Sequence, residues 1–276
     1  MFDVETSVRL WKHSGHGCLL GAVTFTADGQ LLAFGGNTNI AVVLAAADGR
    51  VTQRRRVPSN TQAFVQAAIS PDGTRLATAV GTAFRSYDIS SGAKTLDLSL
   101  GTEWCDDIQY SPDGTRVATL ADDGVRVWDA ASGQQQMTLH PEATVDSMVF
   151  GHCGHVLVTT DEDRVVRVWV VATGTQHRQL RPAPETTAVS LSPDGRLALT
   201  SGDDRTLRIW DVIGECERTR PPAAVQFRGG ASLSHDGTKL ATVNGRLVGI
   251  WRIGVADDTI IGEPPQAGGC AWCGVG

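Results

Sequence analysis

Three side chains in this sequence have the residue types of a hydrolase triad. His140 could act as a base, Thr159 could supply a hydroxyl nucleophile and Asp163 could orient the imidazole. A catalytic triad is normally built once in a protein. Related residues recur further along this chain, as Thr200 and Asp204, so the pattern favours a structural role. We therefore assign no catalytic residue.

Two other groups could bind a metal or carry redox chemistry. Cys270 and Cys273 have the Cys-x-x-Cys spacing, but they lie in a predicted strand, whereas a redox pair normally sits at a helix N-terminus. A zinc site would also need a second pair of ligands. His152 and His155, with Cys153 and Gly154 between them, are predicted to form an irregular turn with exposed imidazoles. No metal and no cofactor is expected.

The chain contains an internal repeat. Six glycines that close similar turns stand 44, 41, 40, 41 and 42 residues apart: Gly29, Gly73, Gly114, Gly154, Gly195 and Gly237. Four tryptophans follow the same period, each 41 residues after the last: Trp128, Trp169, Trp210 and Trp251. Two independent markers with one period indicate a repeat architecture.

Each repeat reads as four short strands joined by Gly, Pro and Asp turns. In the third repeat the expected strands cover 108–110, 117–120, 125–128 and 136–139. No long segment has the period of a helix. A meander of about 41 residues predicts one blade of a β-propeller, an architecture that leaves few sheet edges exposed.

An arginine recurs two residues before the aromatic position of the third strand. Strand alternation places it on the same face as the aromatic ring, where its stem can pack while its head reaches water or a carboxylate. We interpret these arginines as structural: Arg9, Arg85, Arg126, Arg167 and Arg208.

At these residues the chain resembles the WD-repeat β-propeller family. The resemblance rests on the Ser-Pro-Asp-Gly turns and on the Trp-Asp endings at 128–129 and 210–211, with Tyr87-Asp88 as a variant, and it covers residues 5–276. It implies a hydrogen-bonded set of His, Ser or Thr, Asp and Trp in each blade. The residues that match are His140, Thr159, Asp163 and Trp169; Thr200, Asp204 and Trp210; Thr119, Asp123 and Trp128; and His16.

The fold expected is all-β, a propeller of four-stranded antiparallel blades in a single domain over residues 1–276. Six repeats carry the turn. A third-strand pattern at Val8–Trp11 and a first-strand pattern at Cys270–Cys273 predict a seventh, incomplete blade assembled from both termini. The alternative is six blades with appended strands.

Composition excludes some classes of function. The net charge of −6 argues against a nucleic-acid-binding face, and the short run Arg54–Arg56 is expected to be a solvated turn or strand end. The sequence shows no signal peptide and no membrane span, so we expect a cytoplasmic protein with reduced cysteines. The 21 arginines against three lysines indicate a GC-rich, bacterial coding sequence.

The function expected is a non-enzymatic scaffold or a regulatory or sensory signalling module that binds other proteins or peptides as a monomeric domain. WD-repeat propellers generally act in this way, so the expectation is carried by the resemblance. The alternative is a propeller enzyme, such as a metal-dependent hydrolase or lactonase with its site in the central channel. The surface residues selected for partner binding are Trp104, Arg164, Arg205, Glu142 and Glu185.

Overall fold

The computed structural model describes residues 10–11, 20–37, 39–58, 64–101, 104–139, 143–151, 154–163, 165–180, 186–191, 197–202, 207–211, 217–219, 231–233, 239–244, 247–253 and 260–261. For the strands after residue 180 it describes the backbone, together with the side chains of Leu197 and Leu199. These residues form strands and turns and contain no helix. The chain divides into two compact units, Met1–Val145 and Asp146–Gly276.

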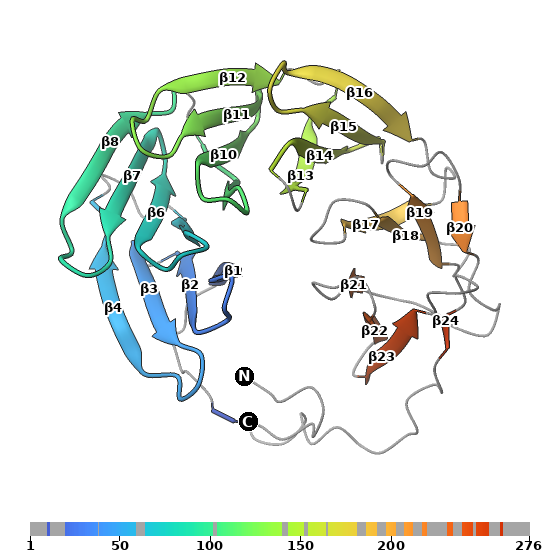
Figure 1. Ribbon diagram of the computed structural model, residues 1–276, viewed down its shortest axis with the longest axis horizontal. Helices are drawn as coiled ribbons and strands as arrows, with labels where there is room; N and C mark the ends of the chain where they lie inside the picture. Colours follow the sequence, from blue (N-terminus) through green and yellow to red (C-terminus); the bar gives the residue numbers. More distant parts are fainter. Residues whose placement is uncertain are drawn as a thin grey trace. The chain divides into compact units, whose positions relative to one another are not determined.

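The described part of the first unit contains three sheets, labelled by strand in Figure 1. Sheet 1 has strands β1 (Leu20–Phe25), β2 (Leu31–Gly36), β3 (Ile40–Ala45) and β4 (Val51–Arg56). Sheet 2 has β5 (Gln66–Ile69), β6 (Arg75–Val80), β7 (Ala83–Asp88) and β8 (Lys94–Ser99). Sheet 3 has β9 (Asp107–Tyr110), β10 (Arg116–Ala121), β11 (Gly124–Asp129) and β12 (Gln135–Leu139).

The second unit contains three further sheets among its described residues. Sheet 4 has β13 (Val145–Phe150), β14 (Val156–Asp161), β15 (Val166–Val170) and β16 (Thr175–Leu180). Sheet 5 has β17 (Thr186–Leu191), β18 (Leu197–Gly202), β19 (Leu207–Asp211) and β20 (Glu217–Thr219). Sheet 6 has β21 (Ala231–Leu233), β22 (Lys239–Asn244), β23 (Leu247–Ile253) and β24 (Ile260–Ile261).

Every sheet is a four-stranded meander in which consecutive strands pair in order. The pairs for which a register is described are antiparallel, as in sheet 3, where Thr119 lies opposite both Ile108 and Arg126. The predicted four-stranded repeat is therefore confirmed. The seven-bladed ring and its closure by both termini stay predictions.

The core of the first unit lies between neighbouring sheets. Consecutive residues of the middle strands are buried, as in β6, because both faces of these strands are covered. Fourth strands alternate between exposed and half-buried residues, as in β4 and β8. Ala33, Val43 and Ile69 belong to one apolar cluster that joins sheets 1 and 2, and Phe84, Ile108 and Trp128 belong to another that joins sheets 2 and 3.

Only part of the predicted N-terminal strand lies among the described residues, and that part is Leu10 and Trp11. The Trp11 indole N–H donates to the carbonyl oxygen of Ala46 at 2.7 Å, and its ring packs with Leu32 and Leu44 of sheet 1. A Cβ added at Gly49 would lie 2.6 Å from this ring, so the ring rests directly on the turn after β3. Trp11 thus packs against sheet 1.

Candidate partner-binding site

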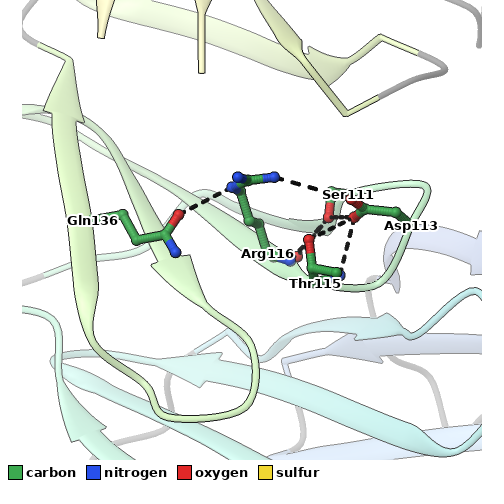
Figure 2. Close-up of polar contacts among 5 residues, drawn as sticks. All are labelled: Ser111, Asp113, Thr115, Arg116 and Gln136. Atoms are coloured by element: carbon green, nitrogen blue, oxygen red, sulfur yellow. Dashed lines mark hydrogen bonds and ion pairs between the residues drawn. The ribbon is translucent and has the colours of Figure 1, made fainter. Parts of the chain in front are cut away.

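The serine, aspartate and glycine of the repeated turn hold the turn itself. In Figure 2 the Ser111 hydroxyl donates to Asp113 Oδ1 at 2.6 Å and accepts the Arg116 backbone N–H at 2.9 Å. Asp113 also accepts the backbone N–H of Thr115 at 3.0 Å, and Gly114 takes a φ of 70°. Burial raises the pKa of Asp113, but the bonds from Ser111 and Thr115 outweigh it and leave the pKa below its usual value.

The same turn stands at corresponding places in sheets 1 and 2. Ser70 donates to Asp72 at 2.6 Å, and Thr26 donates to Asp28 at 2.6 Å. Successive turns also touch, because the N–H of Ala27 donates to the carbonyl oxygen of Pro71 at 2.9 Å. These hydroxyls and carboxylates are committed to backbone geometry.

The aspartate after the aromatic residue has a similar role in the next turn. Asp129 accepts the backbone N–H of Ser132 at 2.8 Å and its hydroxyl at 2.8 Å. Asp88 makes the equivalent bonds to Ser90 and Ser91, which lower its pKa to about 2. At these two positions, the aspartate after the aromatic residue therefore closes a turn.

Two of the predicted indole contacts are present. Trp169 Nε1 donates to Thr159 Oγ1 at 2.9 Å, and Trp128 Nε1 donates to Thr119 Oγ1 at 2.9 Å. Thr159 and Thr119 are 1% and 2% exposed. A threonine hydroxyl that accepts a buried indole N–H is a structural group, because it satisfies a donor that would otherwise lack a partner.

In sheet 4 the buried aspartate is not the one that the resemblance implied. Asp163 is exposed, and the buried acid beside Thr159 is Asp161, which is 1% exposed. Asp161 forms an ion pair with Arg167 and accepts the N–H of Val165 at 2.8 Å. Strand alternation explains the difference, since Asp161 shares a face of β14 with Thr159 and Arg167 lies opposite Thr159 in the register.

Asp123 pairs with the arginine of the repeated position in sheet 3. Its side chain is 49% exposed and pairs with Arg126, whose Nη1 donates to Asp123 Oδ1 at 2.8 Å. In the register, the pair Thr119–Arg126 encloses one residue fewer than the corresponding pair Thr159–Arg167 of sheet 4. Arg85, Arg126 and Arg167, which occupy the repeated arginine position, each pair with a different aspartate: Asp97, Asp123 and Asp161.

Several predicted residues lie outside the described part of the chain. They are His16, His140, Glu142, Arg164, Glu185, Asp204 and Arg205, together with the sequence motifs at His152–Cys153 and Cys270–Cys273. Thr200 lies in β18 and Trp210 in β19, where the backbone is described.

Trp104 is the predicted partner-binding residue that the structure places. Trp104 is 53% exposed and stands three residues before the start of β9. The next residues are anchored: Cys105 is 8% exposed and its thiol donates to the carbonyl oxygen of Asp107 at 3.2 Å, and the N–H of Asp106 donates to Leu120 at 2.9 Å. Burial raises the pKa of the Cys105 thiol to about 12, so it stays protonated. A large ring is thus presented from a fixed backbone.

Acidic residues surround this end of sheet 3. Asp106 is exposed, and burial together with Asp122 raises its pKa. Burial raises the pKa of Asp107 to about 6, against the opposing hydrogen bonds from Ile108 at 2.8 Å and Gln109 at 3.0 Å. Sequence reasoning missed these acids, although the pair Asp106–Asp107 interrupts the otherwise apolar start of the strand. Among the described residues no three His, Cys, Asp or Glu side chains gather in a way that could hold a metal ion.

No helix in the described residues is long and apolar enough to cross a membrane. Three segments of the chain, residues 97–129, 133–170 and 175–211, match the family model described as WD domain, G-beta repeat. The first and last matches begin in the fourth strand of a sheet, and the second match begins just before a fourth strand. Each match ends in the third strand of the following sheet. No curated protein matches the chain. The three matches, together with the four-stranded sheets that contain them, support a WD-repeat family for this chain.

Proposed function

We propose that the chain is a non-enzymatic protein-interaction scaffold or a regulatory module, acting in the cytoplasm as a monomeric domain over residues 1–276. WD40 repeats imply a scaffold kind of function, and the three matched segments support it. Fold alone does not decide function, so the proposal rests on the site.

One observation carries it: Trp104 is 53% exposed, and the two residues that follow it are held by hydrogen bonds to Asp107 and Leu120. Aromatic side chains of this size often dominate the binding energy of an interface. The backbone beside Trp104 is tied down by Cys105 and Asp106, so little conformational entropy would be lost on binding.

The test is affinity capture from the native host with the whole chain as bait, followed by affinity measurement with the purified partner. Trp104→Ala should weaken binding at least tenfold without a change in melting temperature. Phe25→Ala is the matched control, because Phe25 is an aromatic residue of similar exposure, 48%, on sheet 1. Equal affinities for wild type and Trp104→Ala would refute the role of Trp104.

The enzyme alternative is tested on the same preparation. A metal-dependent hydrolase would retain a divalent ion in stoichiometric amount, which elemental analysis of the purified protein measures. A bound ion at that level, with hydrolytic activity that a chelator removes, would overturn the scaffold proposal.

A further inference from the structure

We propose that the free edge of β4 is a docking site for an extended acidic segment of a partner protein, which adds to sheet 1 as a fifth strand. The inference rests on the proposed scaffold function but concerns a surface on a different sheet from Trp104. It starts from the arginines of β4, which the sequence presents only as a short basic run.

The backbone of β4 is open on one side. β4 is the last strand of sheet 1 and pairs with β3, and Figure 1 labels no strand beyond it in the described residues of this unit. The N–H of Val57 donates to Asn39 at 2.8 Å, so residues 39 and 57 form a hydrogen-bonded pair. Hydrogen-bonded and non-hydrogen-bonded pairs alternate along an antiparallel ladder. Arg55, two residues before Val57, is therefore in a hydrogen-bonded pair with β3, whereas Arg54 and Arg56 are in non-hydrogen-bonded pairs. The N–H and C=O groups of Arg54 and Arg56 therefore point to the free edge.

The side chains of the same two residues are exposed. Arg54 and Arg56 stand two residues apart, so their guanidinium groups share one face of the strand. None of the ion pairs found among the described residues involves either group. Two uncompensated positive charges on a chain of net charge −6 form a local site for carboxylates.

The alternate side chains hold the strand in place. Arg55 donates to the carbonyl oxygen of Gly92 and its guanidinium lies 4.5 Å from the centre of the Tyr87 ring. Gln53 donates to the carbonyl oxygen of Ile89 at 3.3 Å. Because these contacts fix β4 against sheet 2, its outer edge is ordered before a partner arrives.

The other fourth strands of this unit differ. On β8, Asp97 forms ion pairs with Lys94 of the same strand and with Arg85 of β7. The positive charge of Lys94 is therefore paired. On β12 the exposed positions include Gln135 and Gln136, and Gln136 accepts from Arg116 Nε at 3.0 Å. In the first unit, β4 is the described fourth strand that combines a free edge with two unpaired charges of one sign. A strand with Asp or Glu at alternate positions would match both the backbone groups and the guanidinium groups.

The experiment uses the whole chain and a synthetic peptide of alternating Glu and Val, with fluorescence anisotropy as the readout at low salt. We expect saturable binding that weakens as salt is added. Arg54→Gln/Arg56→Gln should weaken binding about three- to tenfold, the effect of losing two exposed ion pairs. The control Thr95→Glu/Ser99→Glu changes the net charge by the same −2 at exposed positions of β8 and should bind as wild type does.

A second peptide distinguishes strand addition from simple charge attraction. N-methylation of alternate residues, on the side that would face β4, removes the backbone donors and keeps every carboxylate. Loss of binding supports the inference, whereas unchanged binding overturns it. The inference is also overturned if the arginine variant binds the peptide as tightly as the wild type. It is overturned as well if the wild type does not bind the peptide and the arginine variant self-associates, because the arginines would then only protect the edge from pairing with another copy. If the peptide does not bind but the partner captured from the host still binds through Trp104, the docking inference fails and the proposed scaffold function remains.

Discussion

The buried Thr159 hydroxyl accepts the indole N–H of Trp169, and Thr119 does the same for Trp128. At the corresponding place in sheet 2 the aromatic residue is Tyr87, and Thr78 instead donates a long bond, 3.4 Å, to the carbonyl oxygen of Arg85. Removal of the threonine hydroxyl would therefore leave an indole N–H without its acceptor in sheets 3 and 4, but not in sheet 2.

Thr159→Val should lower the free energy of unfolding by roughly 1–3 kcal/mol, because valine keeps the shape but leaves a buried indole donor without an acceptor. Thr78→Val is the matched control, since Thr78 is also fully buried and no indole depends on it. It should cost clearly less in urea-induced unfolding. Equal losses for the two variants would show that the Thr159–Trp169 bond adds little to stability.

At the scale of the elements, sheets 1 and 2 approach closely at one glycine. Gly35 lies on β2, and a Cβ built there would stand 2.0 Å from the carbonyl oxygen of Val65, just before β5. Apolar residues on both sides, such as Ala33 and Ala67, belong to the shared cluster and are also small. The sheets can lie this near each other because the contact carries no side chain at Gly35.

Gly35→Ala should destabilise the protein by roughly 1–3 kcal/mol, because the added methyl group forces the two sheets apart. The atoms in its way are backbone atoms of Val65, so the second substitution Val65→Ala should not restore stability. Thermal unfolding measures both. Full recovery in the double variant would mean that the side chain of Val65, and not its backbone, sets the distance.

At the scale of the whole molecule, two groups of aspartates respond to pH in opposite ways. Hydrogen bonds in the turns lower the pKa of Asp28, Asp88 and other turn acids, whose contribution to stability is therefore lost as pH falls below about 4. Burial raises the pKa of Asp107 to about 6, so its ionisation destabilises the fold as pH rises from about 4 through 6. These groups together predict maximal stability in mildly acidic solution.

Asp107→Asn should raise the free energy of unfolding at pH 7 by roughly 1–3 kcal/mol, since the folded protein no longer holds a buried charge there. The gain should shrink as pH falls toward 4, where the wild-type carboxyl is protonated in the folded state. Melting temperatures of both proteins from pH 4 to pH 8 give the comparison. A gain that does not change with pH would show that Asp107 does not titrate in this range.

The period of the repeat, visible in its glycines and tryptophans, predicts the described strands of sheet 3 to within one residue at each end. Local chemistry accounts for this success. Ser-Pro-Asp-Gly forms its turn through bonds within six residues, and the Asp after the aromatic residue caps the next turn. Alternation along the third strand also places Arg85, Arg126 and Arg167 where their heads can reach water or a carboxylate, and in the structure each meets a carboxylate.

The sequence by itself thus determined the four-stranded repeat and its turns, because these depend on residues near one another in the chain. The resemblance implied that threonine and tryptophan of one repeat belong to one hydrogen-bonded set. Which carboxylate each arginine meets was decided by the tertiary structure. Asp161 replaces Asp163 because burial and cross-strand register act over the folded sheet. The folded sheets also divide the basic run of β4, since Arg55 packs against Tyr87 while Arg54 and Arg56 face solvent.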